Sequence, residues 1–405
     1  MGARSRHETG WRRAKPRFPS ALIFWSVLAM ALDIGVARLT YGAVLPGLSR
    51  DLHLSFTSAG VLSAVNLAGY LIGTLMAPRL GTVLGMPRLA FAGHLVVAVG
   101  AALTGLAIEP IGLGVGRVLM GLGAGVGLVA LFVMVFAATA SHARPLVSTV
   151  IWSGIGLALV LTGILLPHAL GVGEWRYAFL LAAAVGVAIS AGLWRAAGSG
   201  GTVSSQSNVV AGDVVAGGGT LRWAPLFAAY FMFGVAYIAY STFAGARLAS
   251  SGAPIAIIAM SWVVLGAATI AGCALTALVL SSIVIRKLAL GGALLCGAVG
   301  ALLVGFQGTF YPLLASVFVG LGLASTPAIV TAYVRQRTDD AAYARLFSLA
   351  TASLGVGQLL GPVLGGVLAD RYGSSAITIF AATCYAVGTV FALVDAATDR
   401  RAVRS

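Results

Sequence analysis

Long apolar stretches alternate with short loops along the whole chain, and this alternation constrains the fold more than any other feature. Roughly twelve stretches of about twenty residues each can be marked, and a hydrocarbon core about 30 Å thick needs ~20 helical residues to cross it. Because 59% of the residues are hydrophobic and only 9% are charged, no water-soluble core is expected. The sequence therefore predicts an all-α polytopic membrane protein with twelve transmembrane helices.

The chain is strongly basic, with a formal net charge of +14, but its basic residues follow the loops. Most of them lie before the first apolar stretch or in alternate loops after it. Under the positive-inside rule this asymmetry places both termini in the cytoplasm. The expected location is the cytoplasmic (inner) membrane of a bacterium. The asymmetry also argues against a nucleic-acid partner. A cleaved signal peptide is a competing interpretation of the N-terminus, but the run Ala21 to Leu45 is too long for one.

The reactive residue types show no pattern typical of a cofactor or an active site. Cys273, Cys296 and Cys384 fall in apolar stretches without paired spacing, so neither a disulfide framework nor a metal site is expected. The sequence contains no Walker motif and no clustered histidines or paired acids of an intramembrane enzyme. We therefore expect no cofactor, no catalytic activity and an ion gradient as the energy source.

The predicted spans form two sets of six that resemble each other. Met120–Ala124 and Val319–Leu323 share a Gly-x-Gly pattern at an offset of about 200 residues, as an internal duplication would produce. The first span is predicted at Ala21 to Leu45 and the tenth at Tyr311 to Val334. The predicted organisation is an N-terminal cytoplasmic arm (1–20), a six-helix bundle (21–195), a cytoplasmic linker (196–222), a second six-helix bundle (223–395) and a cytoplasmic tail (396–405).

Several short motifs resemble those of the major facilitator superfamily. Arg117–Ala124 resembles the Arg-x-x-x-Gly motif of its fourth span, and Gly357–Gly366 resembles its Gly-Pro-x-x-Gly-Gly packing motif. Other segments resemble the YbfB/YjiJ-like branch, namely Gly35–Tyr41, Asn66–Tyr70 and Tyr230–Gly234. The resemblance implies two pseudo-symmetric bundles and secondary active transport of a small molecule by alternating access.

Full charges inside the predicted spans are rare, and they mark candidate functional residues. Asp33, Arg38 and Arg117 each cost about 2.5–3.5 kcal/mol to insert near a helix centre, so they should face a cavity or each other. In an α-helix Asp33 and Arg38 would be rotated by about 140°, which favours an arginine from another helix as the partner of Asp33. In proton-coupled members of the superfamily, an acid in the first span is often paired with the fourth-span arginine.

The resemblance therefore implies proton-coupling roles for Asp33 and Arg117. A purely structural ion pair and a permanently neutral Asp33 remain alternatives. Two arginines against one carboxylate leave a positive excess, and guanidinium suits bidentate capture of a carboxylate or phosphate. An organic anion is therefore the favoured substrate, although one arginine tying backbone carbonyls at a broken helix is the competing interpretation.

An aromatic stripe is predicted on the seventh span. Tyr230, Phe233, Tyr237 and Tyr240 fall within about 80° of one helical face. Packing or lipid contact is the common role of such a stripe, but buried hydroxyls need partners, which favours a cavity wall. We predict a substrate site formed by Arg38, Asn66, Tyr70, Arg117, Trp152, Tyr230, Phe233, Tyr237, Tyr240 and Gln358.

Two further expectations concern the third and fourth spans. His94 is alone in the third span and is expected to make a buried interhelical hydrogen bond, with a proton relay as the alternative. Gly121-x-x-x-Gly125 and Gly123-x-x-x-Gly127 predict close helix packing.

The sequence as a whole predicts a monomeric transporter with a small-molecule substrate, the proton and the lipid bilayer as its partners. A non-transporting receptor on the same fold is the alternative.

Overall fold

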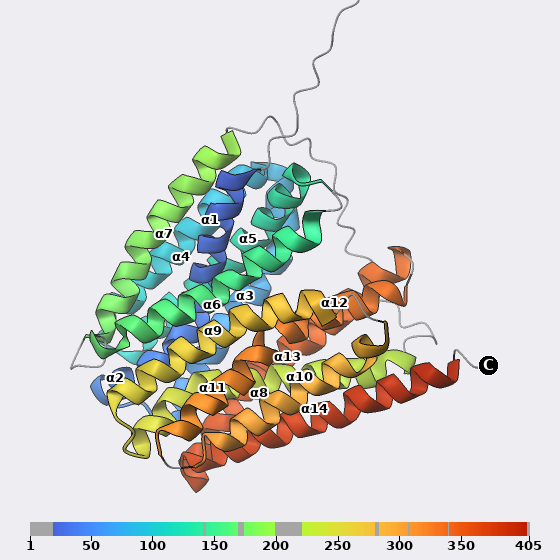
Figure 1. Ribbon diagram of the computed structural model, residues 1–405. Helices are drawn as coiled ribbons and strands as arrows, with labels where there is room; N and C mark the ends of the chain where they lie inside the picture. Colours follow the sequence, from blue (N-terminus) through green and yellow to red (C-terminus); the bar gives the residue numbers. More distant parts are fainter. Residues whose placement is uncertain are drawn as a thin grey trace, which may run out of the picture.

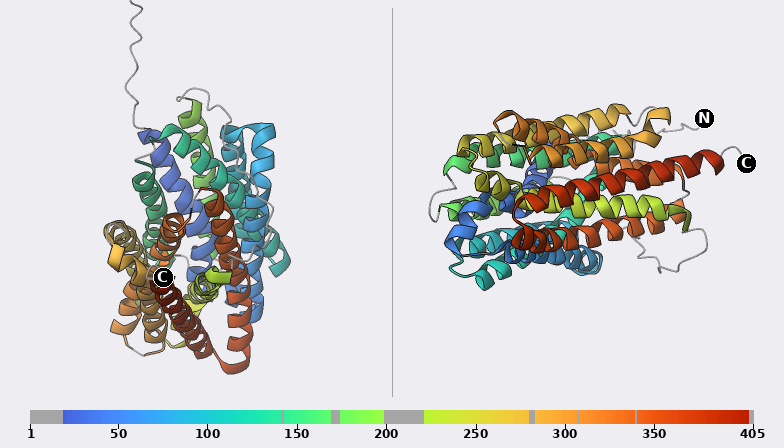
Figure 2. Two further views of the ribbon diagram at one scale, coloured as in Figure 1. Left: turned by 90° about the vertical axis from the view of Figure 1, so that its right-hand side faces the viewer. Right: turned by 90° about the horizontal axis from the view of Figure 1, so that it is seen from below.

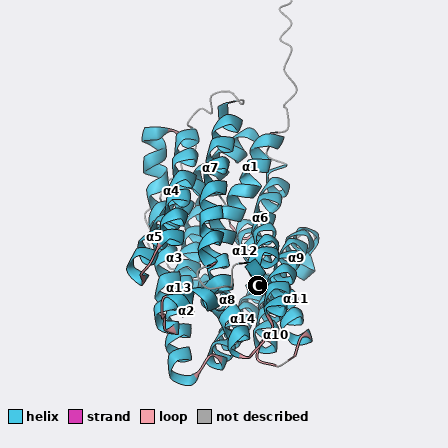
Figure 3. Cartoon of the chain, turned by 90° about the vertical axis from the view of Figure 1, so that its left-hand side faces the viewer, coloured by secondary structure: helices cyan, strands magenta, loops and turns pink. Residues whose placement is uncertain are grey.

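The structure is a computed structural model that describes residues 19–140, 143–168, 174–198, 221–279, 283–306, 308–338 and 340–402. These residues form helices and loops without a strand (Figure 3). Eleven of their helical segments are long and apolar enough to cross a membrane, and Leu288–Leu303 is a shorter apolar helix. The prediction of an all-α multi-pass membrane protein is therefore confirmed. Most of the predicted arm and linker, at 1–18 and 199–220, lies outside the described residues.

The N-terminal half begins with a single long span whose middle is not α-helical. This span of 32 residues runs through α1 (Ser20–Met30), η1 (Ala31–Thr40) and α2 (Tyr41–Asp51). The half continues with α3 (Phe56–Leu84), α4 (Met86–Leu106), α5 (Pro110–Ala138), α6 (Arg144–Leu165), the short turn η3 (Leu166–His168) and α7 (Trp175–Gly198).

The η1 segment is a π-helix of ten residues, which the sequence analysis did not anticipate. A π-helix bonds residue i to residue i+5, is rare, and is found mostly as single turns near functional sites. Residues five apart therefore lie nearly above one another in η1. Asp33 and Arg38, expected on different faces of an α-helix, are instead one turn apart on the same side of the span.

The C-terminal half follows the same order with one interruption. Its elements are η4 (Leu221–Trp223), α8 (Ala224–Ser250), α9 (Ile255–Val279), α10 (Ile283–Leu303), α11 (Phe310–Leu323), α12 (Ser325–Gln336), α13 (Asp340–Tyr372) and α14 (Ser375–Ala402). The tenth span, predicted as one helix, breaks at Ala324. Pro327 lies in the first turn beyond this break and lacks a backbone donor, whereas Pro362 lies inside the uninterrupted α13.

The two halves form separate bundles that meet along one end of the molecule (Figures 1 and 2). We call the end where α2 gives way to α3 the closed face, and the end where α1 begins and α14 stops the open face. At the closed face the Asp370 carboxylate accepts hydrogen bonds from the backbone N–H groups of Phe56 and Thr57, at 2.9 and 2.8 Å. A carboxylate at a helix N-terminus is favourable because it satisfies free donors and the helix dipole.

Small residues allow the helices to approach this closely. A Cβ on Gly42 would overlap the carbonyl oxygen of Ser241 in the other half. Within the N-terminal half, Gly121 and Gly125 pack against α3, while Gly123 and Gly127 pack against α4. The predicted close packing of the two Gly-x-x-x-Gly faces is thus confirmed, and α5 is held between two neighbours.

Candidate functional site: a central cavity

A cavity of about 470 Å³ lies between the two halves. The N-terminal half supplies its walls from η1, α3, α5 and α6, and the C-terminal half from α8, α11, α12 and α13. Lining residues extend along α5 from Leu128 to Phe136 and along α13 from Gln358 to Phe347, toward the open face in both helices. The cavity therefore reaches from the middle of the molecule to the open face.

Arg38 is the only charged side chain among the described residues that line this cavity. It lies on η1 and is 7% exposed. Its guanidinium stacks on the Tyr70 ring, with 4.6 Å from Cζ to the ring centroid. Its Nη1 donates a hydrogen bond of 3.4 Å to the Tyr237 hydroxyl of the other half, while Nε has no hydrogen-bond partner among the described residues. The guanidinium is thus positioned but not saturated.

The C-terminal half faces Arg38 with neutral polar and aromatic groups. The Gln358 amide donates a hydrogen bond of 2.6 Å to the same Tyr237 hydroxyl. Phe233 stacks between Tyr237 and Tyr230, at centroid distances of 4.8 and 6.1 Å. Such stacking fixes the rings and leaves an apolar aromatic wall. Seven of the predicted site residues line the cavity: Arg38, Tyr70, Trp152, Tyr230, Phe233, Tyr237 and Gln358.

Tyr240 does not line the cavity, contrary to expectation. It contributes instead to a small separate pocket with Trp262 and Ser316, inside the C-terminal half. Helical periodicity placed it correctly on the face of Tyr237, but the cavity ends at the level of Tyr237. Beyond that level α8 packs against α2, as the contact between Ser241 and Gly42 shows. Periodicity predicts a face of a helix and says nothing about where a cavity stops along it.

Arg117 and Asn66 are also outside the cavity lining, because both hold backbone groups. Arg117 is fully buried, and its Nη1 and Nε donate to the carbonyl oxygens of Ala37 and Leu62 at 2.8 and 3.2 Å. Its guanidinium lies 4.1 Å from the Tyr41 ring centroid. Asn66 donates to the Arg117 carbonyl oxygen at 2.9 Å. Arg117 thus ties the backbone of the η1 segment to α3 and α5, as in the competing interpretation given above.

Asp33 contacts His94 and not the expected Arg117. The Asp33 Oδ2 and His94 Nε2 atoms are 3.2 Å apart, and both side chains are fully buried. They lie within the N-terminal half, behind the cavity wall. Pairing with Arg117 was wrong because that guanidinium donates to the carbonyl oxygens of Ala37 in η1 and Leu62 in α3. The signal for His94 was present in the sequence, since a second ionisable residue inside a neighbouring span is itself a candidate partner for a buried acid.

Sequence reasoning also missed part of the aromatic lining. Phe132, Phe136 and Phe347 line the cavity, and Phe132 lies 6.2 Å from Trp152 between ring centroids. In an apolar membrane span a phenylalanine at a cavity wall cannot be told from one that faces lipid. No signal in one sequence distinguishes these positions.

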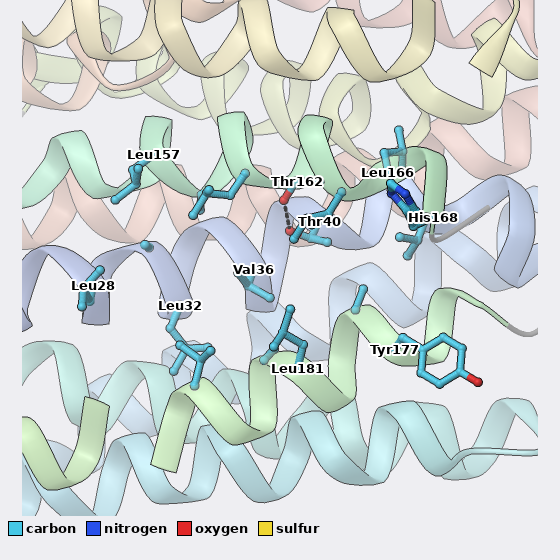
Figure 4. Close-up of a pocket in the computed structure, with 18 of the residues that line it drawn as sticks. Leu28, Leu32, Val36, Thr40, Leu157, Thr162, Leu166, His168, Tyr177 and Leu181 are labelled. Atoms are coloured by element: carbon cyan, nitrogen blue, oxygen red, sulfur yellow. Dashed lines mark hydrogen bonds between the residues drawn. The ribbon is translucent and has the colours of Figure 1, made fainter. Parts of the chain in front are cut away.

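A second cavity of about 270 Å³ lies within the N-terminal half, between the first span, α6 and α7. Figure 4 shows that leucines such as Leu32, Leu157 and Leu181 surround it, with one hydrogen bond between Thr40 and Thr162. The described residues that line it all belong to the N-terminal half. A site within one half would not change when the two halves move relative to each other. The central cavity is therefore the better candidate for the substrate site.

Two helical bundles around a shared cavity form the architecture of major facilitator transporters, and the comparisons with solved structures agree. A bacterial homologue of the human lysosomal transporter Spinster, in an inward-facing and occupied conformation, matches with a TM-score of 0.70 at 16% identity over 96% of this chain and 98% of that one. The nucleoside transporter NupG matches with a TM-score of 0.68 at 14% identity over 94% of this chain and 98% of that one. At these identities the likeness concerns the fold alone.

The family follows from the sequence itself. The family of uncharacterised MFS-type transporters typified by YbfB matches residues 29–395, and the chain belongs to it. A relative from Bacillus subtilis (strain 168), the uncharacterized transporter YycB, is 28% identical over 162 residues. That match covers 39% of this chain and 40% of the relative. The predicted family is thereby confirmed, and the chain is a multi-pass membrane protein of this transporter family.

Proposed function

We propose that this transporter moves a small organic solute with an anionic group through the central cavity, by alternating access and at the expense of a proton gradient. The observation that carries the proposal is Arg38, a buried cation on the wall of a cavity shared by both halves. Its guanidinium has unused donor capacity at Nε. An arginine fork matches the geometry of a carboxylate or phosphate.

The surroundings of Arg38 favour an anion with an apolar, flat body. No acidic side chain is among the described residues that line the cavity, so a cationic substrate would meet an uncompensated guanidinium. Tyr70, Phe132, Trp152 and Phe233 provide apolar surface around it. Aromatic walls favour ring stacking at low cost in conformational entropy.

The arrangement of the halves supports alternating access. The contacts of Asp370 with Phe56 and Thr57 hold the closed face together, while the cavity reaches the open face. The positive-inside rule predicts that both termini lie in the cytoplasm. The open face, where α1 begins and α14 stops, is then the cytoplasmic face, and this is the inward-open state. Rocking of one bundle against the other would then expose Arg38 to the opposite side.

Proton coupling is assigned to Asp33, with Arg117 in a supporting role. Asp33 is fully buried within the first span and one π-turn away from Arg38. A buried carboxyl that is charged in one state and neutral in another is the usual device by which a transporter senses a proton gradient. Arg117 holds the Ala37 carbonyl of the same segment and so fixes the backbone that carries both residues.

Ligand-induced thermal stabilisation of the purified protein tests the anion site. The panel contains benzoate, phenylacetate and indole-3-acetate, each beside its uncharged amide. We expect stabilisation by carboxylates and not by amides. Arg38→Lys keeps the charge but loses the planar fork, so the affinity for the carboxylate should fall by about tenfold or more. Stabilisation by the amides, or equal affinity in Arg38→Lys, would contradict an anion site at Arg38.

Transport itself is tested in proteoliposomes with the carboxylate that stabilises the protein most. An imposed inward proton gradient should drive its accumulation, and dissipation of the gradient by a protonophore should stop it. Specific binding without any flux would favour the receptor alternative over the transporter proposed here.

A further inference from the structure

The contact between Asp33 and His94 joins two buried side chains whose facing atoms have no other partner among the described residues. The two side chains are fully buried, yet the Asp33 oxygens and His94 Nε2 have no hydrogen-bond partner among the described residues. At 3.2 Å the two atoms are within hydrogen-bond distance, and a hydrogen bond forms between them only when one of the two carries a proton. Buried polar atoms left in this way are costly and call for a functional explanation.

The second ring nitrogen of His94, Nδ1, determines how many protons the Asp33–His94 pair can hold. His94 Nδ1 lies 2.7 Å from the carbonyl oxygen of Ala90, and a carbonyl can only accept, so Nδ1 carries a hydrogen. In the neutral ring Nε2 then carries a lone pair, which faces the Asp33 carboxylate. Without a further proton, two electron-rich atoms oppose each other. One proton between Oδ2 and Nε2 removes that repulsion.

The location of the proton follows from the cost of burial. An imidazolium beside a carboxylate would place two charges in a dry interior, whereas a carboxylic acid donating to a neutral imidazole places none there. The loaded pair is therefore neutral, with the proton on Asp33, and the empty pair carries one negative charge. Gly127 makes this arrangement possible, because a Cβ there would contact the His94 ring.

The π-helical geometry connects this pair to the cavity. Asp33 and Arg38 are five residues apart in η1, hence about one turn apart, so their charges lie close together in a buried segment, where charges interact strongly. When the pair has lost its proton, the Asp33 anion attracts the Arg38 guanidinium. When the pair is loaded, that attraction ends and Arg38 is free to bind an anion in the cavity.

The remaining ionisable groups around η1 do not replace Arg38 in this role. Arg117 of α5 is committed to carbonyl oxygens and to the Tyr41 ring of α2. Tyr70 of α3 lies against Arg38 itself. The α1 segment contains no ionisable residue, and α6 and α7 carry theirs only near their ends.

From these contacts we infer that Asp33 and His94 form a single-proton site, and that one proton is taken up with each monovalent anion that binds at Arg38. The inference deepens the proposed function and rests on it for the anion. It assigns His94 as a coupling residue and predicts electroneutral symport, because one positive and one negative charge move together.

The proton site can be tested without any substrate, by infrared difference spectroscopy as the pH is raised. We expect the C=O band of one protonated carboxyl to disappear with rising pH in the wild type and to be absent in Asp33→Asn. In His94→Gln the band should persist, with its midpoint moved by about one pH unit or more. His168→Gln, an exposed histidine at η3, is the matched control and should behave as wild type. An unchanged midpoint in both His94→Gln and a second variant, His94→Asn, would overturn the inference.

Coupling to the anion is tested by the pH dependence of binding of the stabilising carboxylate. Above the midpoint of the band, its Kd in the wild type should rise about tenfold per pH unit, as expected for one linked proton. Asp33→Asn should bind with no such dependence. A pH-independent Kd in the wild type would overturn the inference. If no carboxylate binds, the proposed function fails, while the infrared result still decides whether the single-proton site exists.

Discussion

The two halves of the molecule bring different chemistry to the same cavity. The N-terminal half buries the charges of Asp33, Arg38 and Arg117, whereas the C-terminal half presents Phe233, Tyr237 and other neutral groups. A network of charges is sensitive to small changes in distance. Because this network lies inside one bundle, the rocking proposed above would leave it intact and would change contacts between the halves, such as Arg38 to Tyr237.

A similar division separates the two arginines inside the N-terminal half. Arg117 acts as a structural clamp on Ala37, Leu62 and Tyr41 and lies outside the cavity lining. Each arginine keeps one nitrogen without a partner among the described residues, but only Arg38 lies on the cavity wall. In the function proposed above, the same residue type therefore stabilises the fold at one position and binds the substrate at another.

The largest effect is expected at Asp33, the buried acid of the charged N-terminal half. Asp33→Asn removes the only carboxylate of the buried network and leaves an amide that cannot take up a proton. We expect gradient-driven accumulation in proteoliposomes to be lost, while exchange of the carboxylate across the membrane continues. Full accumulation by the variant would remove Asp33 from the coupling mechanism.

Accessibility to a water-soluble thiol reagent tests the aromatic wall of the C-terminal half. In a background without Cys273, Cys296 and Cys384, single cysteines at the three lining positions of α8 should react, and the bound carboxylate should protect them. These positions are Tyr230, Phe233 and Tyr237. Cysteines at Tyr240, which lies beyond the cavity, and at Ala228 and Val235, on other faces, should stay unreactive.

Equal reactivity at Tyr237 and Tyr240 would mean that the cavity extends farther toward the closed face than the structure indicates. Reaction confined to Ala228 and Val235 would assign the aromatic stripe to a packing surface. Either outcome would leave the substrate without a defined wall in the C-terminal half.

The sequence predicted the features that depend on periodicity and composition. The helical class, the two-bundle fold and the close packing of Gly121, Gly123, Gly125 and Gly127 follow from patterns that any membrane helix must satisfy. The lining face of α8 also follows from periodicity. Periodicity does not show how far along α8 the cavity extends. Tyr240 was therefore included in the predicted site, although the cavity stops at Tyr237.

The partner of Asp33 was missed for a different reason. Over the ten residues of η1, hydrophobic periodicity is too short to distinguish a π-helix from an α-helix. A tertiary contact also lies on this segment, the hydrogen bond from Arg117 to the Ala37 carbonyl oxygen. Once Arg117 is committed there, Asp33 requires another partner, and His94 occupies that place.

The contrast between the two arginines predicts different losses on substitution. Arg117→Met leaves the carbonyl oxygens of Ala37 and Leu62 without their donors, at a cost of about 1–3 kcal/mol for each. We expect a clear decrease in the thermal denaturation midpoint, measured by fluorescence-detected size-exclusion chromatography. Arg38→Met should leave that midpoint nearly unchanged and abolish stabilisation by the carboxylate. Similar losses of stability in both variants would remove the distinction between clamp and ligand.

The smallest predicted effect concerns the single hydroxyl that joins the two halves at the cavity. The Tyr237 hydroxyl accepts hydrogen bonds from Arg38 and from Gln358. Tyr237→Phe keeps the stacked ring and removes only this acceptor, which should cost about 0.5–1.5 kcal/mol, seen as a few-fold weaker Kd for the carboxylate in calorimetric titration. Tyr240→Phe removes the same group from the same face of α8, but outside the cavity, and should leave the Kd unchanged. If both variants weaken binding equally, the hydroxyl acts through the packing of α8 and not through the position of Arg38, and contact between the halves at this point would not contribute to recognition of the anion.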